Sequence, residues 1–71
     1  MVLRRLPLEA SSRFVGKALK ESGIRNHFHC LVAGVEKADG NLHIPDPNRP
    51  LEEGDTLWLV GEHKDIDALM G

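Results

Sequence analysis

A chain of 71 residues with a single cysteine must hold its core together without an internal disulfide. A domain this small buries only about 60% of the surface that its unfolded chain exposes, so its stability is marginal. Small scaffolds usually gain stability from disulfides, a metal or oligomerisation, and Cys30 has no second thiol to pair with. Self-association or a metal therefore remains as the added support. A lone thiol also fits a reducing cytoplasm.

The charge balance and the few aromatic residues argue against several partners. Nine Lys and Arg stand against eleven Asp and Glu, and the formal charge is −2. With only Phe14, Phe28 and Trp58 as aromatic residues and no basic stripe, we expect no nucleic-acid partner. No apolar run approaches the roughly 20 residues that span a bilayer, and residues 1–5 lack the apolar core of a signal peptide. We expect a soluble, cytoplasmic domain, and its early first strand indicates a piece cut from a longer protein.

Alternating and apolar runs predict four strands. The first covers residues 3–8, where Pro7 has no N–H to donate and so favours an edge or a strand end. The most apolar run, residues 29–35, predicts a central strand. Residues 42–44 and 56–60 complete the set. In the central strand, side chains of alternate residues share a face, and we expect one face to carry Leu31, Ala33 and Val35.

Two helices are predicted beside these strands. Ser11 or Ser12 can cap the first by accepting hydrogen bonds from free N–H groups, and Gly23 ends it. An apolar stripe follows helical spacing in this segment, formed by Phe14, Ala18 and Leu19. Residues 65–70 predict a short second helix, with apolar positions at Ile66, Leu69 and Met70.

Turns separate these elements. The Asp-Gly pair in residues 38–41 tolerates positive φ and predicts a hairpin, and residues 53–55 predict a second turn. Three prolines in residues 45–50 block regular structure. The order is therefore β-α-β-β-β-α, an α+β fold with two helices packed on a small sheet, and residues 1–71 form a single domain.

The same order of signals resembles the TrkA-C domain, also called RCK-C, along nearly the whole chain. The resemblance rests on Val-Gly-Lys-Ala-Leu at 15–19, Ser-Gly-Ile-Arg at 22–25, the strand at 31–35 and the turn at 39–40. The most telling piece is the Leu-x-x-Gly-Asp-x-Leu-x-x-x-Gly pattern at 51–61. The Ser-Gly-Ile-Arg form looks most like KefB-like cation:proton antiporters that carry this domain at their cytoplasmic C-terminus.

The resemblance implies a homodimer that senses a ligand and biases a potassium or other monovalent cation transporter, with no cofactor. Some TrkA-C domains bind cyclic di-AMP in a cleft at the dimer interface. In these, an arginine before the central strand meets phosphate and an asparagine early in that strand meets the nucleotide. Arg25 stands at the arginine position, whereas Leu31 replaces the asparagine. The resemblance thus implies an anionic small ligand or nucleotide, with Arg25, Phe28, Leu31 and Val32 as the candidate binding residues.

A zinc site at His27, His29 and Cys30 competes with a plainer interpretation. In a strand, His27 and His29 share a face while Cys30 points away. A closed zinc site also needs four ligands. We therefore favour Cys30 as a small apolar core residue over a metal ligand.

Other candidate residues also have two interpretations. Arg25 can clamp an anion through its planar fork, or it can be a solvated arginine at a helix end, paired with Glu21. A glycine in the middle of a strand, such as Gly34, indicates that something approaches the backbone closely, and we favour a packed helix over a ligand. For Trp58 and Phe28 we expect core packing first and interface anchoring second. For the acidic residues at 52–55 we favour a place in a solvated turn over a role in acid/base catalysis.

No nucleophile and base pair, phosphate-binding glycine loop or Cys-x-x-Cys motif is present, so we expect no enzyme. Two functions remain. The first is a dimeric, ligand-sensing module of a cation transporter. The second is a purely structural dimerisation module that binds nothing small, with a dry interface packed by Leu31 and Val35.

Overall fold

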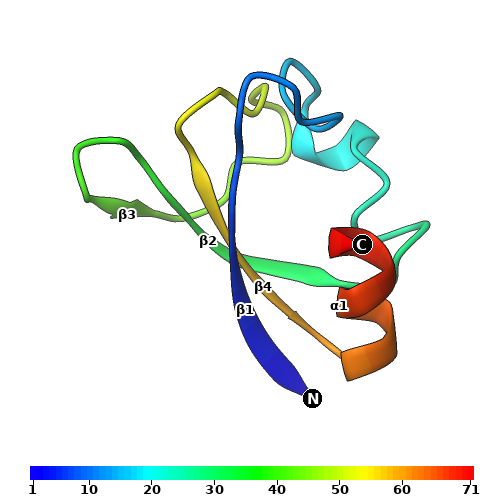
Figure 1. Ribbon diagram of the computed structural model, residues 1–71. Helices are drawn as coiled ribbons and strands as arrows, with labels where there is room; N and C mark the ends of the chain where they lie inside the picture. Colours follow the sequence, from blue (N-terminus) through cyan, green and yellow to red (C-terminus); the bar gives the residue numbers. More distant parts are fainter.

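An antiparallel sheet of four strands carries the fold, and a computed structural model describes all 71 residues. The strand order is β1-β4-β2-β3 (Figure 1). The elements are β1 (Val2–Pro7), a 3-10 turn η1 (Leu19–Glu21), β2 (Leu31–Glu36), β3 (Leu42–His43), β4 (Thr56–Gly61) and α1 (His63–Met70). The α+β class, the four strands and the C-terminal helix are confirmed. Pro7 lies at the end of the edge strand β1, as expected from its missing N–H.

The first predicted helix is wrong. Residues 11–23 form turns and the short η1 instead of an α-helix. Gly16 has a φ of +87° and Ala18 is extended, so the backbone cannot continue a right-handed helix. The backbone of this segment instead bonds to a residue distant in sequence. The Gly16 N–H donates to the Leu51 carbonyl at 2.8 Å, and the Leu51 N–H donates to the Lys17 carbonyl at 2.8 Å. Phe14 is nevertheless buried, so the apolar spacing correctly predicted a core residue but not its backbone conformation.

Strand β2 differs from its prediction in two ways. It begins at Leu31, because His29 has a φ of 58° and is not extended. Its register against β4 also shifts between Val32 and Gly34. This bulge inserts one residue, so Val32 and Val35 both pack toward the core while Leu31 is 52% exposed. The expected shared face of Leu31 and Val35 is therefore wrong.

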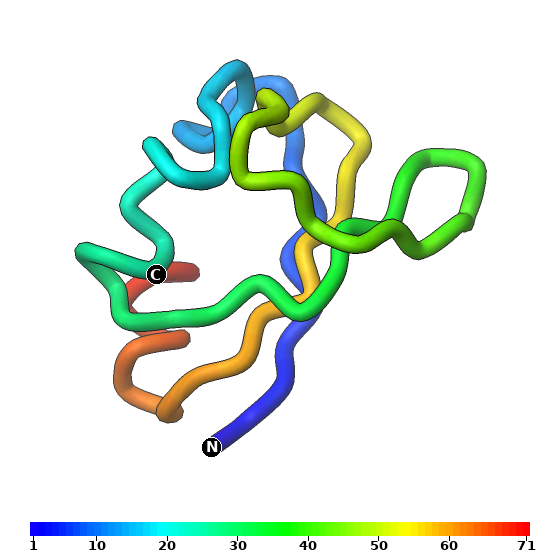
Figure 2. Tube along the Cα trace, turned by 180° about the vertical axis from the view of Figure 1, so that it is seen from behind, coloured from blue at the N-terminus to red at the C-terminus, as the bar shows by residue number.

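The core lies on one face of the sheet, where α1 and the irregular segments cover it (Figures 1 and 2). Leu57 and Leu59 of β4 are fully buried there, and Ile66 and Leu69 of α1 pack against the same cluster. Cys30 is also fully buried in it, which confirms an apolar role although Cys30 precedes the strand. No helix has the length and apolarity needed to cross a membrane.

Trp58 differs from its expected position because it lies on the second face of the sheet. Trp58 alternates with Leu57 and Leu59, so it lies half-buried on the face away from the core. There its Nε1 donates to Glu36 Oε1 at 3.2 Å, and the Arg5 guanidinium carbon lies 5.4 Å from its ring centre. A core position for Trp58 is therefore wrong.

The turn before β4 is less solvated than expected. Asp55 is only 3% exposed, and its Oδ2 accepts the Glu52 N–H at 3.0 Å. Its Oδ1 lies 2.9 Å from Lys37 Nζ. A buried carboxylate is stable only when it is paired and hydrogen-bonded, and Asp55 meets both conditions. Asp55 thus ties this turn to the end of β2.

Candidate ligand-binding groove

A compact turn before β2 presents Arg25 to solvent. Gly23, at a φ of +82°, starts the turn, and its carbonyl accepts the N–H groups of His27 at 2.8 Å and Phe28 at 3.1 Å. The Cys30 N–H donates to the Ile24 carbonyl at 3.0 Å. Ile24 is 1% exposed, so the two ends of the turn are fixed in the core. Arg25 and its neighbours project from a rigid base.

A groove of about 490 Å³ lies beside this turn. Three of the four predicted site residues line it together: Arg25, Leu31 and Val32. The remaining wall was not predicted from the sequence, and it is formed by Leu19, Lys20, Ile24, Asn26, Cys30 and Pro47. This volume lies within the range of small-molecule sites, which usually combine apolar walls with a few polar groups.

Phe28 does not line the groove. Its ring is half-buried against the core and lies edge-on to the His27 ring, with centroids 4.8 Å apart. The guanidinium carbon of Arg13 lies 4.8 Å from the centre of the same ring. Phe28 therefore supports the turn from within, which agrees with core packing as its first role.

The charged side chains of the groove have one sign. Lys20 and Arg25 line it, and no Asp or Glu does, although the chain as a whole is acidic. Arg25 is exposed and makes no side-chain hydrogen bond or ion pair in this structure, so the alternative in which it pairs with Glu21 is not formed. An exposed guanidinium without a partner keeps its donors free for an anion.

The polar and apolar parts of the groove meet at β2. Asn26 offers an amide beside Arg25, whereas Leu31 and Val32 offer only apolar surface. The groove is also next to an unpaired strand edge, because β3 pairs only with Val35 and Glu36. Residues 31–34 of β2 therefore keep backbone groups free on the side away from β4.

Lys20 and Pro47 could not be assigned to the groove from sequence. Lys20 falls within the segment that was predicted as the first helix, and Pro47 lies in the proline stretch where no regular structure was expected. The Lys20 N–H donates to the Pro47 carbonyl at 3.1 Å, which brings together two segments that are separated by 26 residues in the sequence. No local sequence signal reports such a contact.

The predicted alternative of a metal site is not assembled by this geometry. His27 and His29 are exposed, while the Cys30 thiol donates to the Phe28 carbonyl at 3.4 Å inside the core. Burial, and secondarily the charge of Asp65, raises the pKa of the Cys30 thiol. A raised pKa disfavours the thiolate that would bind a metal. No group of three His, Cys, Asp or Glu side chains is placed to hold an ion.

Comparison with known proteins identifies the family. The model of the TrkA-C domain matches residues 3–70. The chain therefore belongs to the TrkA-C family, as its sequence pattern predicts, and the residues that carry the resemblance lie within the matched region.

Solved structures share this fold. The GsuK RCK domain is 32% identical with a TM-score of 0.87, and the match covers 96% of this chain but 14% of that one. The C domain of the RCK unit of the potassium transport protein KtrA, in complex with cyclic di-AMP, is 23% identical, with a TM-score of 0.82 and coverage of 96% and 78%. The RCK_C dimer of S. agalactiae BusR, also with cyclic di-AMP, is 21% identical, with a TM-score of 0.78 and coverage of 99% and 91%. BusR has also been solved with its busAB-promoter DNA, where the match covers 33% of the longer chain.

Proposed function

We propose that this domain is a dimeric, ligand-sensing module on the cytoplasmic side of a monovalent cation transporter, of the cation:proton antiporter type. The observation that carries the proposal is the groove beside Arg25, which holds two cationic side chains and no carboxylate. Family membership supports the regulatory class, and the KtrA and GsuK structures support a link to potassium transport. On this proposal residues 1–71 are one domain of a longer membrane protein.

The ligand that the groove favours is an anion with an apolar part. Arg25 and Lys20 supply charge-assisted donors for a phosphate or carboxylate, and Leu31 and Val32 supply a flat apolar wall. KtrA and BusR have both been solved with cyclic di-AMP, which has this combination of groups. We keep Phe28 as an indirect member of the site, because it supports the turn that presents Arg25.

Dimerisation would complete the site. The unpaired edge at residues 31–34 can pair with the same edge of a second copy, and Leu31 is half-exposed beside it. Two copies related in this way bring two Arg25 guanidinium groups toward one cleft, where they repel each other. An anion between them removes the repulsion. Because a ligand regulates only through different affinities for two states, this closed dimer is the state that the anion selects.

The second candidate is a purely structural dimerisation module. The observation that favours it is the exposed apolar side chain of Leu31 next to a free strand edge, which needs no small ligand to be buried in a dimer. On this alternative Arg25 remains solvated in the dimer. The two functions differ in whether anions stabilise the domain.

The deciding experiment is thermal unfolding with inorganic phosphate and with adenine nucleotides, on wild type, Arg25→Ala and the control Arg4→Ala. Arg4 is also an exposed arginine, but it lies on β1 outside the groove. A ligand at 100 times its Kd stabilises the native state by about 2.7 kcal/mol. We expect this stabilisation in wild type and Arg4→Ala and its loss in Arg25→Ala. Equal stabilisation of all three would remove Arg25 from the site, and a dimer that no anion stabilises would favour the structural module.

A further inference from the structure

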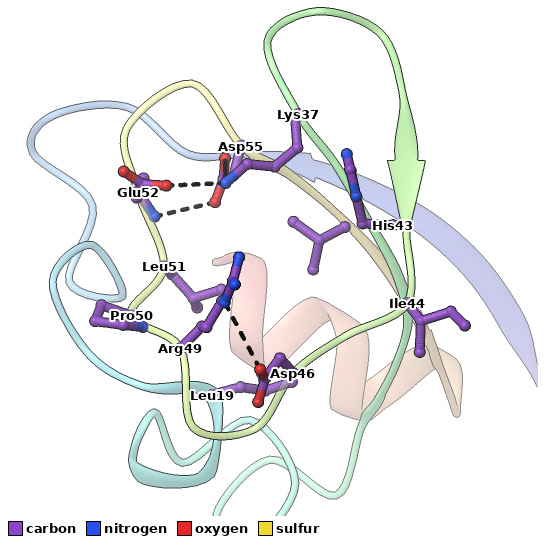
Figure 3. A pocket seen from close by; sticks show the side chains of 11 residues that line it. Leu19, Lys37, His43, Ile44, Asp46, Arg49, Pro50, Leu51, Glu52 and Asp55 are labelled. Atoms are coloured by element: carbon purple, nitrogen blue, oxygen red, sulfur yellow. Dashed lines mark hydrogen bonds and ion pairs between the residues drawn. The ribbon is translucent and has the colours of Figure 1, made fainter.

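A second hollow, of about 320 Å³, lies between the end of β2, strand β3 and residues 44–52 (Figure 3). It shares only Leu19 with the groove beside Arg25. Its apolar surface comes from Val35 and Leu51, both nearly fully buried, together with Leu19 and the exposed Ile44. The volume is at the lower end of the range for small-molecule sites.

One end of the hollow carries a negative charge. Lys37 Nζ lies 2.9 Å from Asp55 Oδ1 and 3.0 Å from Glu52 Oε1, so one ammonium faces two carboxylates. The hydrogen bonds that Lys37 donates, first to Asp55 and then to Glu52, raise the pKa of Lys37, which therefore stays charged. Asp55 uses its other oxygen for the Glu52 N–H. Glu52 Oε2 has no partner, and the side chain is 70% exposed, so one carboxylate oxygen is free to accept.

The other end carries the Arg49 guanidinium, whose one ion pair is a long contact with Asp46. Arg49 projects toward the hollow in Figure 3, and its Nε lies 3.7 Å from Asp46 Oδ2, which is beyond hydrogen-bonding distance. Asp46 uses its Oδ1 to accept the Asn48 N–H at 2.9 Å. The two terminal nitrogens of Arg49 have no partner in this structure. His43 lines the hollow from the side of β3 (Figure 3).

A ligand that matches both ends must carry both charges. A simple anion would meet the negative end formed by Lys37, Glu52 and Asp55, and a simple cation would meet the Arg49 guanidinium. We propose that this hollow binds a small zwitterion of the α-amino acid class, with its carboxylate on Arg49 and its ammonium on the free oxygen of Glu52. Its apolar side chain then covers Val35 and Leu51. This goes beyond the proposed anion groove, since the charged residues of the two sites are different.

The test is a titration of the isotope-labelled protein with L-leucine, followed by amide chemical shifts. We expect saturable shifts at Lys37 and Leu51. Arg49→Gln and Glu52→Gln each remove one charge-assisted contact and weaken binding by about tenfold or more. Both side chains are mostly exposed, so the variants keep the wild-type spectrum away from the hollow. Arg25→Gln, in the other groove, leaves leucine binding unchanged.

Analogues of leucine that lack one charged group test whether the hollow recognises both charges or only takes up an apolar side chain. Isocaproate lacks the ammonium and isopentylamine lacks the carboxylate, and each is expected to bind at least about tenfold more weakly than leucine. Equal binding of either analogue would overturn the proposal, as would the absence of saturable shifts with leucine. A loss of leucine binding in Arg25→Gln would place the amino acid in the other groove and would also overturn it. None of these results depends on whether phosphate or nucleotides bind at Arg25.

Discussion

The guanidinium carbon of Arg13 lies 4.8 Å from the centre of the Phe28 ring, in the turn that presents Arg25, and Arg13 also contacts the last turn of α1. The same guanidinium donates to the Leu69 carbonyl at 2.9 Å and lies 5.0 Å from the Phe14 ring. A cation is favourable at the C-terminal end of a helix, where carbonyl groups lack partners. Arg13 thus connects three segments that are distant in sequence.

Arg13→Ala is therefore expected to destabilise the domain although the residue is exposed. Loss of the carbonyl contact and of the two ring contacts costs about 1–2 kcal/mol, which lowers the Tm of a domain this size by roughly 4–16 °C. Arg13→Lys keeps the charge but not the planar stacking, so an intermediate Tm is expected. Circular dichroism melts measure this, with Arg4→Ala as the control. A Tm equal to wild type in Arg13→Ala would show that the three contacts add nothing to stability.

A homodimer is the second prediction. The chain is short, its core is thin, and residues 31–34 leave a strand edge unpaired beside the half-exposed Leu31. Sedimentation at micromolar concentration is expected to give twice the monomer mass of 7.9 kDa. Leu31→Glu places a charge at this edge and is expected to give monomers, since charged residues block edge pairing. A wild-type monomer at high concentration would contradict the prediction.

Sequence alone predicts the elements that local patterns control. β4 follows strict alternation, with Leu57 and Leu59 on the buried face, and the Asp39-Gly40 turn closes where positive φ is tolerated. These signals lie within a few residues of one another. The α+β class follows from them because each element must cover an apolar face of another.

The errors in the sequence prediction come from interactions between distant residues. Phe14 and Ala18 are spaced as on a helix, but the backbone between them bonds to Leu51 and adopts another path. The bulge between Val32 and Gly34 depends on the register against β4, which the spacing of apolar residues does not reveal. In the groove, Arg25 was identified through family resemblance, whereas Lys20 reaches it only through the Pro47 contact.

The thiol of Cys30 gives a third prediction. Cys30 is fully buried, and burial raises its thiol pKa, so the folded protein is expected to react slowly with a thiol reagent. The raised pKa means that the folded state holds the thiol proton more tightly than the unfolded state. Its contribution to stability is present below the usual thiol pKa, about 8.5, and is lost as pH rises toward the higher folded value.

Chemical unfolding between neutral and alkaline pH tests this sign. Wild type is expected to lose stability as the pH rises past the usual thiol pKa, and Cys30→Ala is expected to show less of this loss, although it is less stable at every pH because it leaves a small cavity. Rapid, complete labelling of the folded protein would show that the turn holding Cys30 opens readily. A pH dependence unchanged in Cys30→Ala would assign it to other groups.

The last prediction concerns cyclic di-AMP, which the KtrA and BusR structures contain. Leu31 lines the groove where the resemblance places an asparagine that meets the nucleotide, and a leucine side chain neither donates nor accepts a hydrogen bond. One missing hydrogen bond costs about 0.5–1.5 kcal/mol, which approaches tenfold in Kd, and more if a buried group of the ligand stays unpaired. We expect weak or no binding of cyclic di-AMP by wild type in calorimetry. Leu31→Asn is expected to strengthen it, while Leu3→Asn, at a leucine of similar exposure outside the groove, leaves it unchanged. Submicromolar binding by wild type would mean that apolar contact with Leu31 and the charge of Arg25 suffice to hold the nucleotide.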